Sequence, residues 1–199
     1  MGDPIAFIIH YLLSAVSLLF LARFILQATH ADFYNPISQG IVRYTDPVLN
    51  PLRKVIPTYK NLDLSAFVAT WVTCAATIGG VAAMTGRFDS YVVVEILQSL
   101  GLTLGAIVAG VYRTFDLFLY FYWIAIFAMI IISLLAPTTY NPVTALLRDV
   151  CEPVLAPARR LLPVMGGLDL SPLIVFLVIG LLQHYLLPAL FGTLFGGGP

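Results

Sequence analysis

The sequence predicts an all-α membrane protein that crosses the bilayer several times, and two observations carry this prediction: its composition and the placement of its charges. Of the 199 residues, 60% are hydrophobic and only 10% are charged, and the mean hydropathy is +0.95. A soluble domain usually carries about 25% charged residues. The charges lie mainly in connectors between apolar runs that are long enough to cross a bilayer as helices. We therefore predict a polytopic α-helical membrane protein.

An internal repeat divides the chain into two units. Residues 34–65 and 140–171 align without a gap at an offset of 106, and thirteen of the 32 positions are identical. Each copy lies between two long apolar runs, so each unit has the form span, connector, span. The expected units are 1–89 and 114–199, with an extra span at 90–113 between them.

Five apolar runs are expected to form spans: 4–28, 64–85, 90–112, 116–136 and 171–191. We expect the first run to be a retained helix rather than a signal peptide, because no Lys or Arg precedes Arg23 and the run is too long. In the third run, Gly101, Gly105 and Ala109 are four residues apart. Small residues at this spacing let two helices approach closely.

Each connector carries a helical apolar face. The first connector places apolar side chains three or four residues apart, at Ile37, Ile41, Tyr44, Val48, Leu52 and Val55. The second repeats the spacing at Val143, Leu147, Val150, Val154, Ala158 and Leu161. This pattern predicts an amphipathic helix. Two interpretations remain open: the helix lies in the membrane interface, or it packs on the spans.

Prolines interrupt the pattern of both connectors, at Pro47 and Pro51 and again at Pro153 and Pro157. An interior proline removes a backbone hydrogen bond and clashes with the preceding turn. We therefore expect a helix over 36–45 that breaks at Asp46–Pro47, with Asp46 capping a second short helical piece.

The number of crossings predicts how the two units are oriented. Three crossings separate the first span from the fourth if every run crosses, so the units would be an inverted pair. One side would then hold six Lys and Arg residues and the other four, a weak bias toward a cytoplasmic first connector. If residues 90–112 do not cross, both connectors share one side.

The repeated motif resembles that of the YggT family of bacterial membrane proteins. The resemblance depends on two sets of motif residues, which are Asn35, Pro36, Asp46, Pro47, Pro57 and Asp63, and Asn141, Pro142, Glu152, Pro153, Pro163 and Asp169. The chain is similar to the long, two-repeat form, to which the one-repeat YlmG proteins are related. The resemblance implies an integral protein of the bacterial inner membrane, with family links to osmotic stress, potassium homeostasis, cell division and, in chloroplasts, haem attachment. It implies no catalytic residues.

Two basic pairs are the first candidate site: Arg53 with Lys54, and Arg159 with Arg160. Basic side chains beside a membrane bind anionic lipid headgroups, and arginine binds phosphate through two parallel hydrogen bonds. There are two alternatives: an ion pair inside each repeat, with Asp63 or Asp169, or basic residues that only set the topology and extend to the membrane interface. These two aspartates are also expected to begin the next span as helix-start residues, at the positive end of the helix dipole.

A second set of candidates is polar side chains within the apolar runs. Glu95 and Gln98 lie one turn apart in the third run, and His10 is expected at a similar depth. Ionisable groups inside a membrane are costly and suggest a function. The three side chains either meet between helices or anchor separately at the interface. His184 stands alone in the last span and is read as a packing residue rather than a ligand.

Composition and motifs exclude several functions. The formal net charge is zero, which argues against nucleic-acid binding. No nucleophile–base set or phosphate loop is visible, and Cys74 and Cys151 form no metal-binding pair, so we expect no enzyme activity, cofactor or metal. We predict a protein of osmotic or envelope stress response, or of membrane organisation, that acts through anionic lipids or other membrane proteins, with self-association left open. The alternatives are a small transporter or channel and an assembly factor for a membrane complex.

Overall fold

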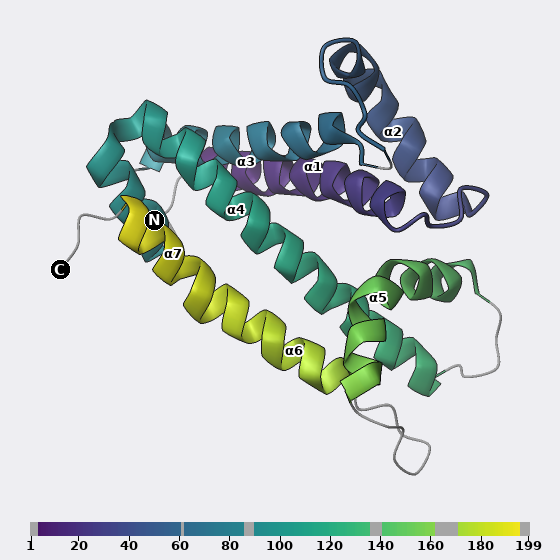
Figure 1. Ribbon diagram of the computed structural model, residues 1–199. Coiled ribbons are helices and arrows are strands. Elements are labelled where there is room, and N and C mark those ends of the chain that lie inside the picture. The colour runs from purple at the N-terminus through teal and green to yellow at the C-terminus, as the bar shows by residue number, and fades with distance from the viewer. Residues whose placement is uncertain (1–3, 61, 86–89, 136–140, 162–170, 196–199) are drawn as a thin grey trace.

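The chain folds almost entirely into helices. The computed structural model describes residues 4–60, 62–85, 90–135, 141–161 and 171–195. Their helices are α1 (Pro4–Ala28), α2 (Pro36–Arg53), α3 (Leu64–Thr85), α4 (Tyr91–Leu135), α5 (Pro142–Leu161), α6 (Ser171–Leu181), the π-helix η1 (Leu182–Leu186) and α7 (Leu187–Phe195) (Figure 1). Within these residues the only β-type pairing is an isolated bridge between Tyr59 and Leu62. The predicted all-α class is confirmed.

The described residues contain four long apolar segments that could cross a membrane, rather than the five separate spans predicted. These segments are α1, α3, α4 and the continuous run α6–η1–α7. The third and fourth predicted spans both belong to α4, which is broken at Gly101 (φ 76°, ψ 174°). A positive φ suits glycine because it lacks a Cβ. Gly101 is therefore the turn between two helical arms, and not part of a packing face.

The short arm of α4 folds back on the long arm. A Cβ placed on Gly105 would lie 2.9 Å from the Cα of Leu97, so the two arms touch backbone to backbone. Val92, Val93 and Ile96 on the short arm form a buried cluster with residues of the long arm. Ten residues extend about 15 Å as a helix, about half the thickness of the hydrocarbon core. Residues 90–112 therefore do not form one crossing helix.

Both connectors lie at the same end of the spans, and the predicted inverted arrangement is wrong. The side-chain Nδ2 of Asn35, before α2, donates to the carbonyl of Pro142 in α5 at 2.6 Å. The backbone N–H of Asp32 also donates to Oδ2 of Asp149 at 3.3 Å. In Figure 1, α2 and α5 lie at one end of the molecule, while α1 begins and α7 ends at the other. Because residues 90–112 do not cross as one helix, the alternative with both connectors on one side is the arrangement observed.

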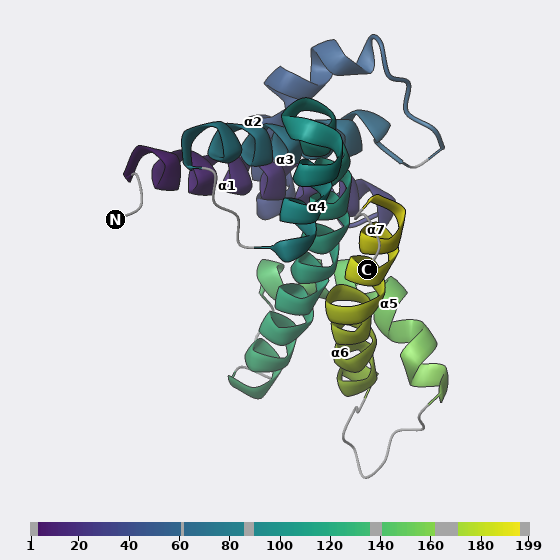
Figure 2. The ribbon, with the colours of Figure 1, turned by 90° about the vertical axis from the view of Figure 1, so that its left-hand side faces the viewer.

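The spans form two antiparallel pairs that meet in the middle. Helix α1 packs along α3, and the long arm of α4 packs along α6 and α7. The two pairs cross where α3 meets α4 (Figures 1 and 2). Gly110 permits this contact, since a Cβ there would lie 2.7 Å from the Cβ of Ala75. The largest buried cluster joins α1, α3, α4, α5 and α6.

Helix α2 continues through Pro47 and Pro51, so the predicted break at Asp46–Pro47 is wrong. The two prolines are four residues apart and both are exposed. They therefore share one outer face, where the carbonyl groups that lose their N–H partners can be solvated. Asn35 caps this helix by accepting from the N–H of Ile37 at 3.0 Å, with Pro36 as the first helical residue. Helix α5 likewise contains exposed Pro153 and Pro157.

The apolar faces of the two connectors have different surroundings. On α5, Val150 and Ala158 are buried, and Leu147 and Val154 pack against the main core. This face follows the packed interpretation. On α2 the buried side chains are Ser38, Thr45 and Leu49, next to the predicted stripe and not in its centre.

The rest of the α2 stripe is divided. Ile41 and Leu52 pack on the cores, whereas Ile37, Tyr44 and Val48 are exposed. An exposed apolar stripe at the end of a membrane-spanning fold is typical of a helix in the interface.

Candidate functional site

Arg53, near the end of α2, is the centre of the largest charged cluster in the described residues. Its Nη2 and Nε donate to Oδ2 of Asp63 at 2.5 Å and 3.2 Å. Its Nη1 donates to Asn50 at 3.2 Å and to Asp46 at 3.4 Å. One guanidinium therefore links the last two turns of α2 to the start of α3. The internal alternative, in which Arg53 pairs with Asp63, is the arrangement in the structure.

Asp63 is fully buried and performs two tasks. Its Oδ2 accepts from Arg53, and its Oδ1 accepts from the N–H of Ala66 at 3.3 Å, in the first turn of α3. Burial alone would raise the pKa of this carboxyl, but the hydrogen bonds and charge of Arg53 outweigh it, and the pKa is lowered. The same contacts outweigh the burial of Arg53 and raise the pKa of its guanidinium. The pair therefore holds the end of the connector against the next span.

Two members of this cluster were missed by sequence reasoning. Arg23, near the end of α1, has Nη2 3.9 Å from Oδ1 of Asp46, and its side chain is only 13% exposed. Asn50 supplies the second oxygen that Arg53 contacts on α2. Arg23 is the only charge in the apolar run 4–28, which was an available signal. With Arg23 the cluster has two positive and two negative charges.

The second connector repeats only part of this site among the described residues. Nη1 of Arg159 contacts both carboxylate oxygens of Glu152, at 2.8 Å and 2.7 Å. These positions match Arg53 and Asp46 at the offset of 106. The Arg159–Glu152 pair is exposed, at 38% and 48% of the two side chains. Asp169 and Pro163, named with them in the predicted motif, lie outside the described residues.

The second residue of each basic pair points outward. Lys54 and Arg160 are exposed, and neither makes an ion pair with a described residue. Arg43 and Arg148 are exposed on the same two helices. These four basic side chains are thus exposed, whereas the donors of Arg53 are engaged inside the chain.

The remaining motif residues begin the helices or leave them. Asn141 accepts from the N–H of Val143 at 2.9 Å, as Asn35 does from Ile37, and Pro142 follows it as the first residue of α5. Pro57 is exposed in the turn that leads from α2 to α3. These residues determine where the connectors begin and end.

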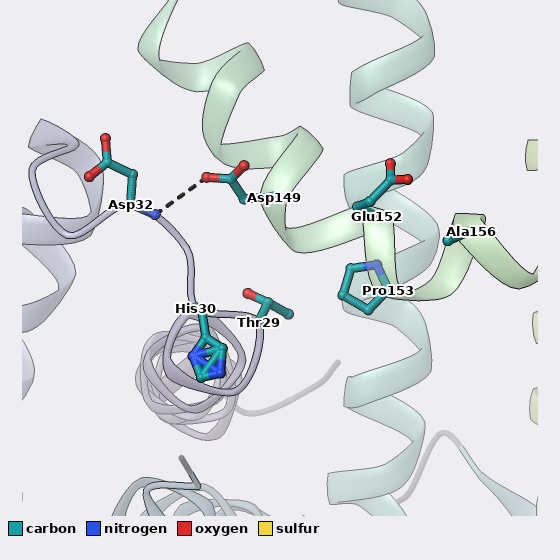
Figure 3. A pocket seen from close by; sticks show the side chains of 7 residues that line it. All are labelled: Thr29, His30, Asp32, Asp149, Glu152, Pro153 and Ala156. Atoms are coloured by element: carbon teal, nitrogen blue, oxygen red, sulfur yellow. Dashed lines mark hydrogen bonds between the residues drawn. The ribbon is translucent and has the colours of Figure 1, made fainter.

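A pocket of about 440 Å³ lies between the end of α1 and α5 (Figure 3). Its lining includes His30, Asp32, Asp149 and Glu152. The carboxylates point in different directions and do not converge on one point. Consistent with this, no cluster suited to a metal ion occurs among the described residues. The pocket gathers no ligand set.

Cys151 lies in the same helix as four residues of this pocket but is fully buried. Burial, with a smaller contribution from the charge of Glu152, raises the pKa of the Cys151 thiol to about 12. The thiol is therefore protonated at neutral pH, and a protonated thiol is a poor nucleophile.

The polar residues predicted within the spans do not form one site. Glu95 and Gln98 are exposed on the short arm of α4, and Glu95 lies near Gly192 of α7. His10 is half-buried and contacts the ring of Tyr11. Within the described residues no hydrogen bond joins these three side chains. His184 is exposed in η1.

A different polar cluster occurs where α4 meets η1. Nη1 of Arg113 donates to Oδ2 of Asp116 at 2.5 Å, and Nε2 of Gln183 donates to Oδ1 of Asp116 at 2.8 Å. Sequence reasoning used Arg113 only for counting charge and did not select Asp116 or Gln183. The signal was present, because an Arg and an Asp three residues apart occur at the start of a long apolar run.

These features define a class: an all-α protein embedded in a membrane, with two amphipathic helices at one end of its spans and a buried ion pair that joins the first of them to the next span. The CCB3/YggT family model matches residues 2–83 and 108–190, most of the chain. The protein belongs to the CCB3/YggT family.

The relatives agree with this assignment. The chain is 38% identical to an uncharacterised protein of Pseudomonas aeruginosa over 89% of this chain and 85% of the relative. It is 31% identical to an uncharacterised protein of Haemophilus influenzae, over 88% and 87% of the two chains. It is 29% identical to the uncharacterised protein YggT of Escherichia coli K12, over 89% and 86%. No solved structure matches the chain.

Proposed function

We propose that this chain is a non-enzymatic, multi-pass protein of the bacterial cytoplasmic membrane that organises the membrane through anionic lipids bound along α2 and α5. Its role in osmotic or envelope stress is part of the proposal and rests on the family resemblance. The single observation that carries the lipid proposal is the surface of α2, which presents an exposed apolar stripe and exposed basic side chains on one helix.

The geometry of α2 suits an interfacial position. Ile37, Tyr44 and Val48 lie on one exposed side of the helix. Arg43 is exposed on another side, and Lys54 is exposed directly after the last helical residue. At 100° per residue the stripe and the basic residues are well separated around the axis. The stripe can therefore enter the hydrocarbon boundary while the basic groups remain among the headgroups.

The distribution of basic residues favours a cytoplasmic position for both connectors. Seven of the ten Lys and Arg residues lie in the connectors, at Arg43, Arg53, Lys54, Lys60, Arg148, Arg159 and Arg160. Only Arg87 lies in the sequence between α3 and α4. Loops rich in Lys and Arg stay in the cytoplasm. The cytoplasmic leaflet carries anionic lipid, which attracts each basic residue by about 1 kcal/mol.

Lipid retention measured by native mass spectrometry tests the proposal. The protein is extracted in detergent with equal amounts of an anionic and a zwitterionic lipid, and the retained lipids are counted. The wild type should retain the anionic lipid preferentially. Replacing Arg43, Lys54, Arg148 and Arg160 by Gln should abolish that preference without lowering thermal stability. Equal retention of both lipids by the wild type would contradict the proposal.

The stress role needs its own measurement, in a deletion strain of a bacterium that carries a family member. Wild-type protein should restore growth after osmotic upshift, and the four-residue Gln variant should not, at equal membrane abundance. Restoration by the variant would separate the lipid contacts from the stress role.

The alternative functions are a transporter or channel and an assembly factor. One observation favours transport: the Arg113–Asp116–Gln183 cluster lies within the spans, and ionisable groups there often mark transport pathways. Flux of potassium or protons into liposomes that contain the purified protein, abolished by Asp116→Asn, would support this candidate.

A further inference from the structure

The Arg113–Asp116–Gln183 cluster lies near the middle of the spans. Ala75, which contacts Gly110 one turn before Arg113, lies about 16 Å along α3 from its start at Leu64, at 1.5 Å per residue. Gln183 lies about 18 Å along the last span from Ser171. Both starts are at the connector end. The hydrocarbon core is about 30 Å thick, so neither interface is within reach of the cluster.

The guanidinium of Arg113 has unused hydrogen-bonding capacity. An arginine carries five N–H donors, and among the described residues its charged partner is Asp116 alone. Its side chain is 44% exposed on the surface of the spans. An exposed Arg at this depth is unfavourable unless acceptors of another molecule satisfy its donors.

Asp116 has the complementary property. Each of its oxygens accepts one hydrogen bond in the structure, from Arg113 and from Gln183. An ionised carboxylate has about four acceptor positions, and 13% of this side chain is exposed beside the arginine. The surface patch of Arg113 and Asp116 thus offers a donor and an acceptor next to each other.

We propose that two copies of this chain associate in the membrane through this patch, with Arg113 of each copy donating to Asp116 of the other. Two copies insert in the same orientation, so a two-fold axis along the membrane normal places both patches at equal depth. A two-fold interface brings the same patch together from both sides and must be self-complementary. One positive and one negative group on each copy meet that condition, and the interface is neutral.

The proposal is independent of lipid binding by α2 and α5. It also gives η1 a role, because π-helical turns inside α-helices are frequent at functional sites. The turn Leu182–Leu186 occurs where Gln183 donates to Asp116. Gln183 thereby holds Asp116 from the α6–α7 side, and the exposed part of the Asp116 side chain, 13%, remains next to Arg113.

Energy transfer between labelled copies in liposomes tests the proposal. Donor- and acceptor-labelled protein, each labelled at the C-terminus, is mixed and diluted with lipid. Wild-type copies should associate. For Arg113→Gln or Asp116→Asn, the protein density in the membrane at which half of the copies are associated should rise by at least about tenfold. The matched control is Arg159→Gln with Glu152→Gln, an exposed ion pair outside the spans, which should leave association unchanged.

The decisive variant exchanges the charges, Arg113→Asp with Asp116→Arg. Within one copy the pair persists, and two exchanged copies remain complementary. An exchanged copy beside a wild-type copy faces like charges across the interface. Energy transfer should therefore occur between like copies and fall for the mixture. Three results would overturn the proposal: monomeric wild type, mixed pairs as frequent as like pairs, or neutral variants that associate as wild type does. If the exchanged variant does not fold, the single neutral variants decide.

Discussion

Nη2 of Arg53 lies 2.5 Å from Oδ2 of Asp63, and this contact closes the first connector onto the second span. Asp63 is 0% exposed and Arg53 is 26% exposed. The charge that remains after one partner is removed is therefore more deeply buried in one case than in the other. Losing Arg53 would leave a buried carboxylate without its cation. Losing Asp63 would leave a partly exposed guanidinium that still contacts Asp46.

Arg53→Ala should therefore destabilise the protein by about 3 kcal/mol, because breaking a buried ion pair leaves an unpaired charge. Arg53→Lys should recover only part of this, since an ammonium lacks the planar fork that bridges Asp63 and Asp46. The measurement is thermal unfolding in detergent. The control is Lys54→Ala, at the exposed residue that follows Arg53, and it should leave the thermal stability nearly unchanged. Equal stability of the Ala and wild-type proteins would rule out a structural role for the pair.

Arg159→Ala should have a much smaller effect than Arg53→Ala. Its contacts with Glu152 are short, but both side chains are substantially exposed. Exposed ion pairs contribute about 1 kcal/mol or less. The two variants test whether burial, rather than distance, decides the value of these repeated arginines. A loss for Arg159→Ala as large as for Arg53→Ala would contradict that explanation.

Stability should fall in acid through Asp63. Its folded pKa is below the ordinary value of 3.8, so the unfolded chain binds the proton more readily. The stability that this carboxylate contributes is fully present above pH 3.8 and is lost as the pH falls through the lowered folded pKa. Asp63→Asn should be less stable at neutral pH and should show a smaller decrease below pH 4. The comparison is thermal unfolding in detergent from pH 3 to pH 7, with Asp149→Asn as the control.

The local signals in the sequence predicted most of the helices and the start of α3. Asp63 accepts from the first turn of α3, as its position before a helix implies, whereas Asn35 and Asn141, which cap α2 and α5, were selected only as motif residues. The arrangement of the helices in space was harder to predict. The apolar composition of residues 90–112 indicates that they prefer lipid, but it does not distinguish a crossing helix from a hairpin. The positive φ of Gly101 decides between them, and hydropathy does not reveal it.

The candidate site was predictable only where its members are close in the chain. Arg53 and Asp63 are ten residues apart, and Pro57 between them restricts the backbone. Gln183 lies 67 residues from Asp116, and no pattern in one sequence links them. The sequence also could not show that the apolar stripe of α2 is exposed. Ile37 and Val150 belong to equivalent apolar faces, but only tertiary packing decides that one is exposed and the other buried.

Both connectors should be accessible from the cytoplasm and the end of α7 from the opposite side. Cysteine replaces Lys54, Arg160 or Leu194, all exposed, in a chain with Cys74→Ala and Cys151→Ala. A membrane-impermeant maleimide added to whole cells should label position 194 only. Inside-out vesicles should show positions 54 and 160 labelled. Labelling of 54 and 160 from opposite sides would restore an inverted arrangement of the repeats.

The last prediction concerns the crossing point of the two helix pairs. Gly110→Ala places a methyl group 2.7 Å from the Cβ of Ala75 and 2.9 Å from its Cα, where backbone must move to relieve the contact. Overpacking of this kind destabilises by about 1–3 kcal/mol, and here it should also separate α3 from α4. Gly180→Ala is the matched control, because it also lies in a span and its Cβ would meet nothing within 4 Å. It should match or slightly exceed wild-type stability, since alanine favours a helix by about 1 kcal/mol over glycine.

Disulfide formation between cysteines at Ala75 and Gly110 is unsuitable as a measure because it alters the contact itself. Thermal unfolding in detergent, together with the distance between spin labels on exposed Val72 and Phe115, reports both effects. If Gly110→Ala and Gly180→Ala behave alike in stability and in distance, the close approach of α3 and α4 at Gly110 is refuted.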